Sequence, residues 1–183
     1  LINEHNQNAI ILDTHKRIKT RWKIEFDKDI TKSQVKKNGF NYASFYDAIM
    51  TSIMMKYDKN KIEWIEKIVI MWSKIPAFLD MFPNGKVIHV HRDPRNIMAS
   101  YKKMTNEVGY TYLNTIFNFV DSVQSLNKFE KKYGKHKILQ VKSEDIANNP
   151  KKILIKICNF LDVEFSNKMM DPNSNAFLLG ESW

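Results

Sequence analysis

Apolar residues recur at helical spacing along several stretches of the chain. Residues 42–57, YASFYDAIMTSIMMKY, place Phe45, Ile49 and Ile53 three to four positions apart, and this period predicts a helix. Ser44 is the expected cap of this helix, because its hydroxyl can accept an early backbone N–H. Helical patterns of the same kind cover residues 76–82, 112–133 and 151–161.

The other stretches of the chain carry weaker or different patterns. Residues 1–40 are polar and weakly patterned, and residues 61–70 fit a strand and a helix equally well. Two short apolar runs, at residues 87–90 and 137–141, have the composition of strands that are buried on both faces. Strand, helix, helix, strand, helix is the order of a parallel sheet with helical crossovers. The predicted fold class is therefore α/β.

The composition fits one globular domain over residues 1–183. Hydrophobic residues make up 43% and charged residues 27% of the 183 positions, which is ordinary for a globular protein. No apolar run approaches the ~20 residues of a membrane span. The first residues lack the layout of a signal peptide, and a cytoplasmic location is favoured. The single cysteine, Cys158, excludes an internal disulfide, gives no metal cluster and has the helical spacing of a core residue.

The positive charge of the chain makes an anionic partner a candidate, but charge by itself decides little. The formal net charge is +9 and the isoelectric point is about 9.5, so nucleic acid is one candidate. However, the lysines are scattered, no run reaches five, and the chain lacks arginine–aromatic interleaving and zinc-finger spacing. A solvated basic surface is the favoured interpretation, and a basic α/β domain that binds nucleic acid is kept as an alternative.

The turn after the first predicted strand carries the most informative chemistry. Ligands of open α/β sheets lie at the carboxyl ends of strands, where helix N-termini present free N–H groups to anions. Asp93 and Pro94 form a helix start, and the guanidinium of Arg92 suits phosphate or sulfate oxygens. An Arg–Asp ion pair without a ligand explains the turn equally well. Ser100 lies roughly 10 Å further along the helix, and spacing alone leaves open whether it reaches the same phosphate.

At these residues the sequence resembles the sulfotransferase family. The family's 3′-phosphate-binding segment is an apolar strand, an R-D-P-R-like turn, and a serine eight residues after the first arginine; here these are residues 87–90, residues 92–95 and Ser100. Downstream, residues 140–165 resemble the family's V-x-Y-E-D-L-x-x-D-P turn and the helix that follows it. Upstream, Lys67 precedes Arg92 by 25 positions, which is similar to the protein-tyrosine and bacterial branches. The resemblance covers about residues 62–183.

The resemblance implies a P-loop NTPase-like αβα sandwich that transfers the sulfuryl group of 3′-phosphoadenosine 5′-phosphosulfate (PAPS) to a hydroxyl or amine. The product of the donor would be adenosine 3′,5′-bisphosphate. By the resemblance, Arg92 and Ser100 would hold the 3′-phosphate, and Lys67 would stabilise the bridging oxygen as the sulfuryl group leaves. Ser174 resembles a late serine that some members bring to the phosphosulfate. No motif identifies the acceptor substrate.

The chain departs from the family pattern in ways that matter for catalysis. The family's first cofactor loop, of the form G-x-P-R-S-G-T-T, does not occur in the 183 residues, nor does an initiator methionine. We expect a truncated domain that lacks its first strand and has an exposed sheet edge. Val69 stands where cytosolic members carry a histidine base, so Glu66 is the fallback base, and Ser143 replaces a tyrosine that lines the adenine. A non-catalytic module that binds nucleotides or polyanions is the second interpretation.

Overall fold

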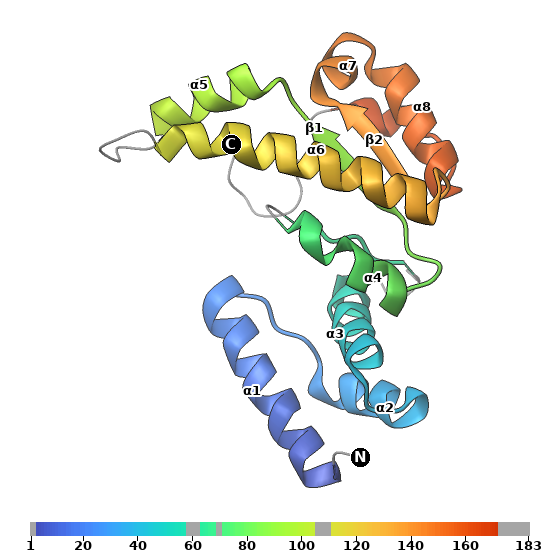
Figure 1. The fold of residues 1–183 in the computed structure, drawn as a ribbon. Coiled ribbons are helices and arrows are strands. Elements are labelled where there is room, and N and C mark those ends of the chain that lie inside the picture. The colour runs from blue at the N-terminus through green and yellow to red at the C-terminus, as the bar shows by residue number, and fades with distance from the viewer. Residues whose placement is uncertain (1–2, 58–62, 69–70, 105–110, 172–183) are drawn as a thin grey trace. The chain divides into compact units, whose positions relative to one another are not determined.

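The computed structural model describes residues 3–57, 63–68, 71–104 and 111–171. The chain divides into two compact units, Leu1–Ile68 and Val69–Trp183. Each unit has its own hydrophobic core. The described elements of the first unit are helices, and those of the second include two strands (Figure 1). No helix in the described ranges has the length and apolar character needed to cross a membrane.

The described residues of the first unit form three helices, α1 (Glu4–Trp22), α2 (Lys28–Asn38) and α3 (Tyr42–Tyr57). α2 contacts both α1 and α3. Three buried residues, one before α2 and one on each of the other two helices, form the core, and three half-buried residues pack against them: Ile11, Phe26 and Ile49, then Ile18, Phe45 and Ile53. α3 confirms the helix predicted at residues 42–57.

The polar stretch before α3 is helical, which the weak apolar pattern did not predict. Side-chain caps begin both helices: Asn3 accepts the N–H of Asn6 at 2.9 Å, and Asp27 accepts two early N–H groups of α2. α2 buries only Thr31 and Val35, one turn apart on the same face. So few apolar positions give too weak a periodic signal, although they suffice to pack each helix.

The predicted cap of α3 is wrong by three positions. Asn41 Oδ1 accepts the N–H of Ser44 at 3.0 Å, and the Ser44 hydroxyl accepts the N–H of Asn41 at 3.2 Å. This reciprocal pair is a capping box, in which the first residue is the cap and the second is the third helical residue. Ser44 therefore supports the helix start from inside the helix, and Asn41 is the cap.

The second unit contains two strands, five helices and three short 3-10 helices among its described residues. In chain order these elements are η1 (Trp72–Lys74), α4 (Ile75–Met81), β1 (Val87–His91), α5 (Pro94–Met104), η2 (Thr111–Leu113), α6 (Asn114–Tyr133), β2 (Ile138–Lys142), α7 (Ser143–Asn148), α8 (Pro150–Leu161) and η3 (Asn167–Met170). Both predicted strands and the helices predicted around residues 76–82, 112–133 and 151–161 are confirmed. The sequence did not predict the short helix α7.

The two strands pair in parallel, with Val87 opposite Ile138 and His91 opposite Lys142. This pairing confirms the predicted α/β class with a parallel sheet. α6, α7 and α8 all contact β2 (Figure 1). Ile138 and Val141 are both buried, and because they point to opposite faces of the strand, both faces of β2 are covered.

β1 is less buried than its sequence predicts. Val90 retains 54% of its surface exposed, so the prediction of burial on both faces is wrong for this strand. Among the described residues, β2 is the one strand that pairs with β1. The core of this unit lies instead around Leu79, Leu126 and Ile138. Cys158 on α8 is 4% exposed, which confirms its predicted core position.

Candidate functional site

The turn between β1 and α5 is built around Asp93. Its carboxylate accepts the N–H of Arg95 at 2.9 Å, and its carbonyl accepts the N–H groups of Asn96 and Ile97 at 3.0 and 3.1 Å. Pro94, the first residue of the helix, has no N–H to satisfy. The predicted helix start at Asp93 and Pro94 is confirmed.

This cap changes the predicted form of the anion site. The first N–H groups of a helix are free to bind an anion only when no other acceptor takes them. Here Asp93 accepts all three N–H groups of residues 95–97. In this structure the three N–H groups are therefore occupied by Asp93, and side chains such as that of Arg92 remain as the candidate contacts for an anion at this turn.

The ion pair that competes with an anion site is formed by Arg95. The Arg95 guanidinium contacts the Asp93 carboxylate, with its Nη2 2.5 Å from Oδ2 and its Nε 3.0 Å from Oδ1. The side-chain hydrogen bond from Arg95 lowers the pKa of Asp93 to about 2. Arg92 is exposed and forms no ion pair with a carboxylate of the described residues. Its guanidinium is thus not committed to Asp93.

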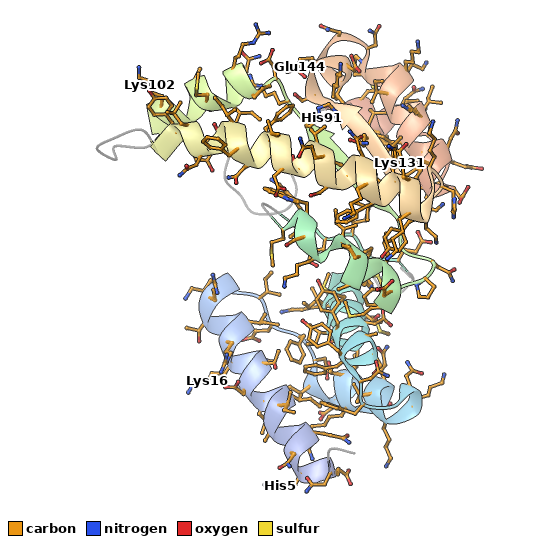
Figure 2. The ribbon with its side chains drawn as sticks, viewed as in Figure 1. His5, Lys16, His91, Lys102, Lys131 and Glu144 are labelled. Atoms are coloured by element: carbon orange, nitrogen blue, oxygen red, sulfur yellow. The ribbon has the colours of Figure 1, made fainter. Side chains whose placement is uncertain are left out.

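The carboxyl ends of the two strands are joined directly. The N–H of Asp93, after β1, donates to Oε1 of Glu144, after β2, at 2.9 Å. Figure 2 labels Glu144 and also His91, the last residue of β1. This hydrogen bond, followed by that of its own backbone N–H, lowers the pKa of Glu144, so its carboxylate is charged at neutral pH. Glu144 is not among the predicted site residues, because its one sequence signal is its place in the V-x-Y-E-D-like motif.

The histidines of β1 remain neutral beside this turn. His89 and His91 lie on the same face of the strand, with ring centroids 5.5 Å apart. Burial lowers the pKa of both rings, and the neighbouring charge of Lys142 lowers that of His91 further. They therefore add no positive charge at neutral pH, which leaves Arg92 as the cationic side chain of the turn itself that is not already paired with a carboxylate.

Glu66 and Lys67 lie in the first unit, in a segment that is neither helix nor strand. Two side-chain hydrogen bonds attach this segment to α3: Trp64 Nε1 donates to Asp47 Oδ1 at 2.9 Å, and the Tyr46 hydroxyl donates to Glu66. Both Glu66 and Lys67 are largely exposed. Even so, partial burial of the carboxyl group raises the pKa of Glu66, which makes it a better proton acceptor than a free glutamate.

Of the remaining predicted site residues, the structure describes Ser100. Ser100 lies in the second turn of α5 and is half-buried, on the helix that Arg92 precedes. Ser174 lies outside the described residues. The structure therefore puts Arg92 and Ser100 in one unit and the pair Glu66 and Lys67 in the other.

Comparison with known proteins identifies the family of the chain. The model of the sulfotransferase family matches residues 5–167. The chain belongs to the sulfotransferase family. The match includes the Arg92 turn, α5, and both strands, so the features described above are part of the family's domain.

A relative and a solved structure agree with this assignment. Over 142 residues, or 74% of its length, this chain is 27% identical to a Caenorhabditis elegans protein named "Putative protein-tyrosine sulfotransferase". The match covers 55% of that protein, so the chain spans about half the length of this relative. The sulfotransferase domain from the curacin biosynthetic pathway superposes with a TM-score of 0.57 over 86% of this chain and 63% of that domain, at 17% identity. This likeness supports the P-loop-like α/β fold.

Loss of the Asp93 side chain is expected to loosen the start of α5. In Asp93→Ala the N–H of Arg95 and the guanidinium of Arg95 lose their acceptor, and the thermal unfolding midpoint should fall by roughly 2–4 °C, as for a lost N-cap in a chain of this size. Asp93→Asn keeps an oxygen acceptor and should lose less. Thermal unfolding followed by circular dichroism measures both, and equal midpoints for wild type and Asp93→Ala would contradict the capping role.

Proposed function

We propose that this sulfotransferase moves the sulfuryl group of PAPS to a hydroxyl or amine acceptor, and that Arg92 binds the 3′-phosphate of the donor. The observation that carries the proposal is that Arg95, and not Arg92, pairs with the carboxylate of Asp93. Arg92 extends from the carboxyl end of a parallel strand, and Arg95 already holds the neighbouring carboxylate of Asp93. A guanidinium in that position can form two parallel hydrogen bonds to phosphate oxygens.

Arg92 and Ser100 would contribute binding and orientation rather than chemistry. A fixed 3′-phosphate positions the remote phosphosulfate, and positioning of this kind lowers the entropic part of the barrier. The Ser100 hydroxyl can donate a further hydrogen bond to the same phosphate. The N–H groups at the start of α5 are occupied by Asp93, so the two side chains would supply the contacts at this turn.

The transfer step is proposed for Lys67 and Glu66 on the basis of the family resemblance. The acceptor oxygen or nitrogen forms a bond to sulfur while the bond from sulfur to the bridging oxygen breaks, and adenosine 3′,5′-bisphosphate leaves with that electron pair. Lys67 would stabilise the negative charge on the bridging oxygen, and Glu66 would accept the acceptor's proton. Ser174 is proposed to contact the phosphosulfate. The name of the Caenorhabditis elegans relative makes a protein tyrosine hydroxyl the first acceptor to test.

A nucleotide-binding module without catalysis is the second candidate. It would apply if the full-length gene product, like these 183 residues, carries no G-x-P-R-S-G-T-T-like loop. Such a module would bind adenosine 3′,5′-bisphosphate but would not consume PAPS in the presence of any hydroxylated acceptor. Assay of bisphosphate release from PAPS by the full-length gene product separates the two candidates.

Replacement of Arg92 should weaken nucleotide binding. Arg92→Ala is expected to cost about 1.5–3 kcal/mol of bisphosphate binding, about 10- to 150-fold in Kd, because hydrogen bonds to a charged phosphate are lost. Arg95→Ala is the matched control. It also removes an arginine side chain from this turn, but one that is paired with the Asp93 carboxylate. Calorimetric titration measures both. A loss within error for Arg92→Ala, or an equal loss for Arg95→Ala, would refute the assignment.

Replacement of Lys67 should affect turnover and spare nucleotide affinity. If Lys67 stabilises only the developing charge on the bridging oxygen, Lys67→Ala lowers kcat by roughly 10²–10³-fold and leaves the Kd for the bisphosphate nearly unchanged. Lys74→Ala, an exposed lysine of η1, serves as the control. A variant that keeps full turnover would exclude Lys67 from the chemistry.

The pH dependence of turnover tests Glu66 as the base. A base acts when deprotonated, so activity should fall as the pH drops through the pKa of Glu66, which burial raises above 4.5. Glu66→Gln should remove this acidic limb and lower kcat by roughly 10²–10⁴-fold. The neighbouring exposed Glu63 supplies the control variant Glu63→Gln. Retention of the acidic limb in Glu66→Gln would assign it to another group.

A further inference from the structure

The carboxylate of Glu144, in the first turn of α7, connects the Arg92 turn to the segment that follows the second strand. Its Oε1 accepts the N–H of Asp93 at 2.9 Å across 51 positions of the chain. Glu144 lies two residues after the end of β2, whose last residue pairs with the last residue of β1. We propose that Glu144 is a positioning residue, which orients Arg92 for the 3′-phosphate by fixing the peptide between Arg92 and Asp93. The inference rests on the proposed role of Arg92.

The geometry of a peptide unit explains how Glu144 can act on Arg92. The N–H of Asp93 and the carbonyl of Arg92 belong to one planar unit and point in opposite directions. When Glu144 holds this N–H, the ψ angle of Arg92 loses its freedom, and so does the direction in which the Arg92 side chain leaves the backbone. A hydrogen bond to a carboxylate is roughly twice as strong as a neutral one, so the restraint is firm.

Within this turn, the backbone N–H of Asp93 is the one that Glu144 accepts, while Asp93 itself accepts the N–H groups that follow. Asp93 uses its carbonyl and its carboxylate for the N–H groups of residues 95–97, while its own N–H goes to Glu144. The Ser143 hydroxyl lies 3.4 Å from the other oxygen of the Glu144 carboxylate. The start of α5 is thus fixed by Asp93 from within the turn, and Glu144 joins the turn to the start of α7, which directly follows β2.

Charge and geometry predict opposite effects for Glu144, which makes the proposal testable. Glu144 interacts electrostatically with Arg92, and as a negative charge near a phosphate site it would weaken anion binding. As a positioning residue it would strengthen binding. Variants that separate charge from reach therefore decide between the two: Glu144→Asp keeps the charge on a shorter side chain, and Glu144→Gln keeps the length and an acceptor oxygen without the charge.

The experiment is a titration of adenosine 3′,5′-bisphosphate into the full chain and its variants. Glu144→Ala and Glu144→Asp should both weaken binding by about tenfold, the size expected when one charge-assisted hydrogen bond is lost. Glu144→Gln should stay within about twofold of wild type, because its amide oxygen still accepts the N–H of Asp93. Asp145→Ala, the adjacent exposed carboxylate, should leave the affinity unchanged. Thermal unfolding of each variant identifies any that fails to fold, in which case the Asp and Gln variants carry the test.

A double-mutant cycle with Arg92 provides the readout that a purely structural role would not change. In the Arg92→Ala background, Glu144→Ala should cause no further loss, because Glu144 acts through Arg92. Additive losses, unchanged affinity in Glu144→Ala, or tighter binding in both Ala and Gln variants would overturn the inference. If Arg92→Ala itself leaves binding unchanged, the proposed function fails; if only the Glu144 variants behave like wild type, the failure is confined to Glu144.

Discussion

The hydrogen bonds of Asp93 are the interaction on which the candidate site depends. One residue accepts the first three available N–H groups of α5 and the guanidinium of Arg95. A helix start at a strand end ordinarily offers backbone N–H groups to an anion, but here they are taken. The same arrangement pairs Asp93 with Arg95 and so leaves Arg92, the preceding cation, available at the strand end.

The parallel pairing of β1 and β2 places this turn next to the residues that follow β2. Because the strands run in the same direction, residues that follow each of them come together at one edge of the sheet. Asp93 and Glu144 meet there although they are 51 positions apart. Both faces of β2 are covered, while β1 keeps Val90 half exposed. The better-packed strand thus anchors the turn of the less-packed one.

Most of the second unit could be predicted from the sequence, because its signals are local. Apolar runs predicted both strands, helical periodicity predicted α6 and α8, and the Asp93-Pro94 pair predicted the start of α5. The helices of the first unit were harder to predict from the sequence. α1 and α2 bury few apolar residues, so their caps at Asn3 and Asp27 were the stronger signals, and the cap of α3 was displaced to Asn41 because Asn41 and Ser44 cap each other.

The site shows the same division between local and long-range information. Arg92 and Ser100 were identified through a motif of nine consecutive positions. The Arg92 assignment is compatible with the structure, in which Arg92 is exposed. The commitment of the N–H groups to Asp93, the choice of Arg95 as its ion-pair partner, and the contact from Glu144 depend on side-chain geometry and on a crossover of the chain. No spacing rule contains that information, which is why Glu144 was missed.

A crystal structure of the protein with adenosine 3′,5′-bisphosphate would test the central claim most directly. The account predicts that the 3′-phosphate lies within hydrogen-bonding distance of the Arg92 guanidinium, while the N–H groups of Arg95, Asn96 and Ile97 remain bonded to Asp93. A 3′-phosphate held by those backbone N–H groups, with Asp93 displaced, or a nucleotide bound away from this turn, would contradict it.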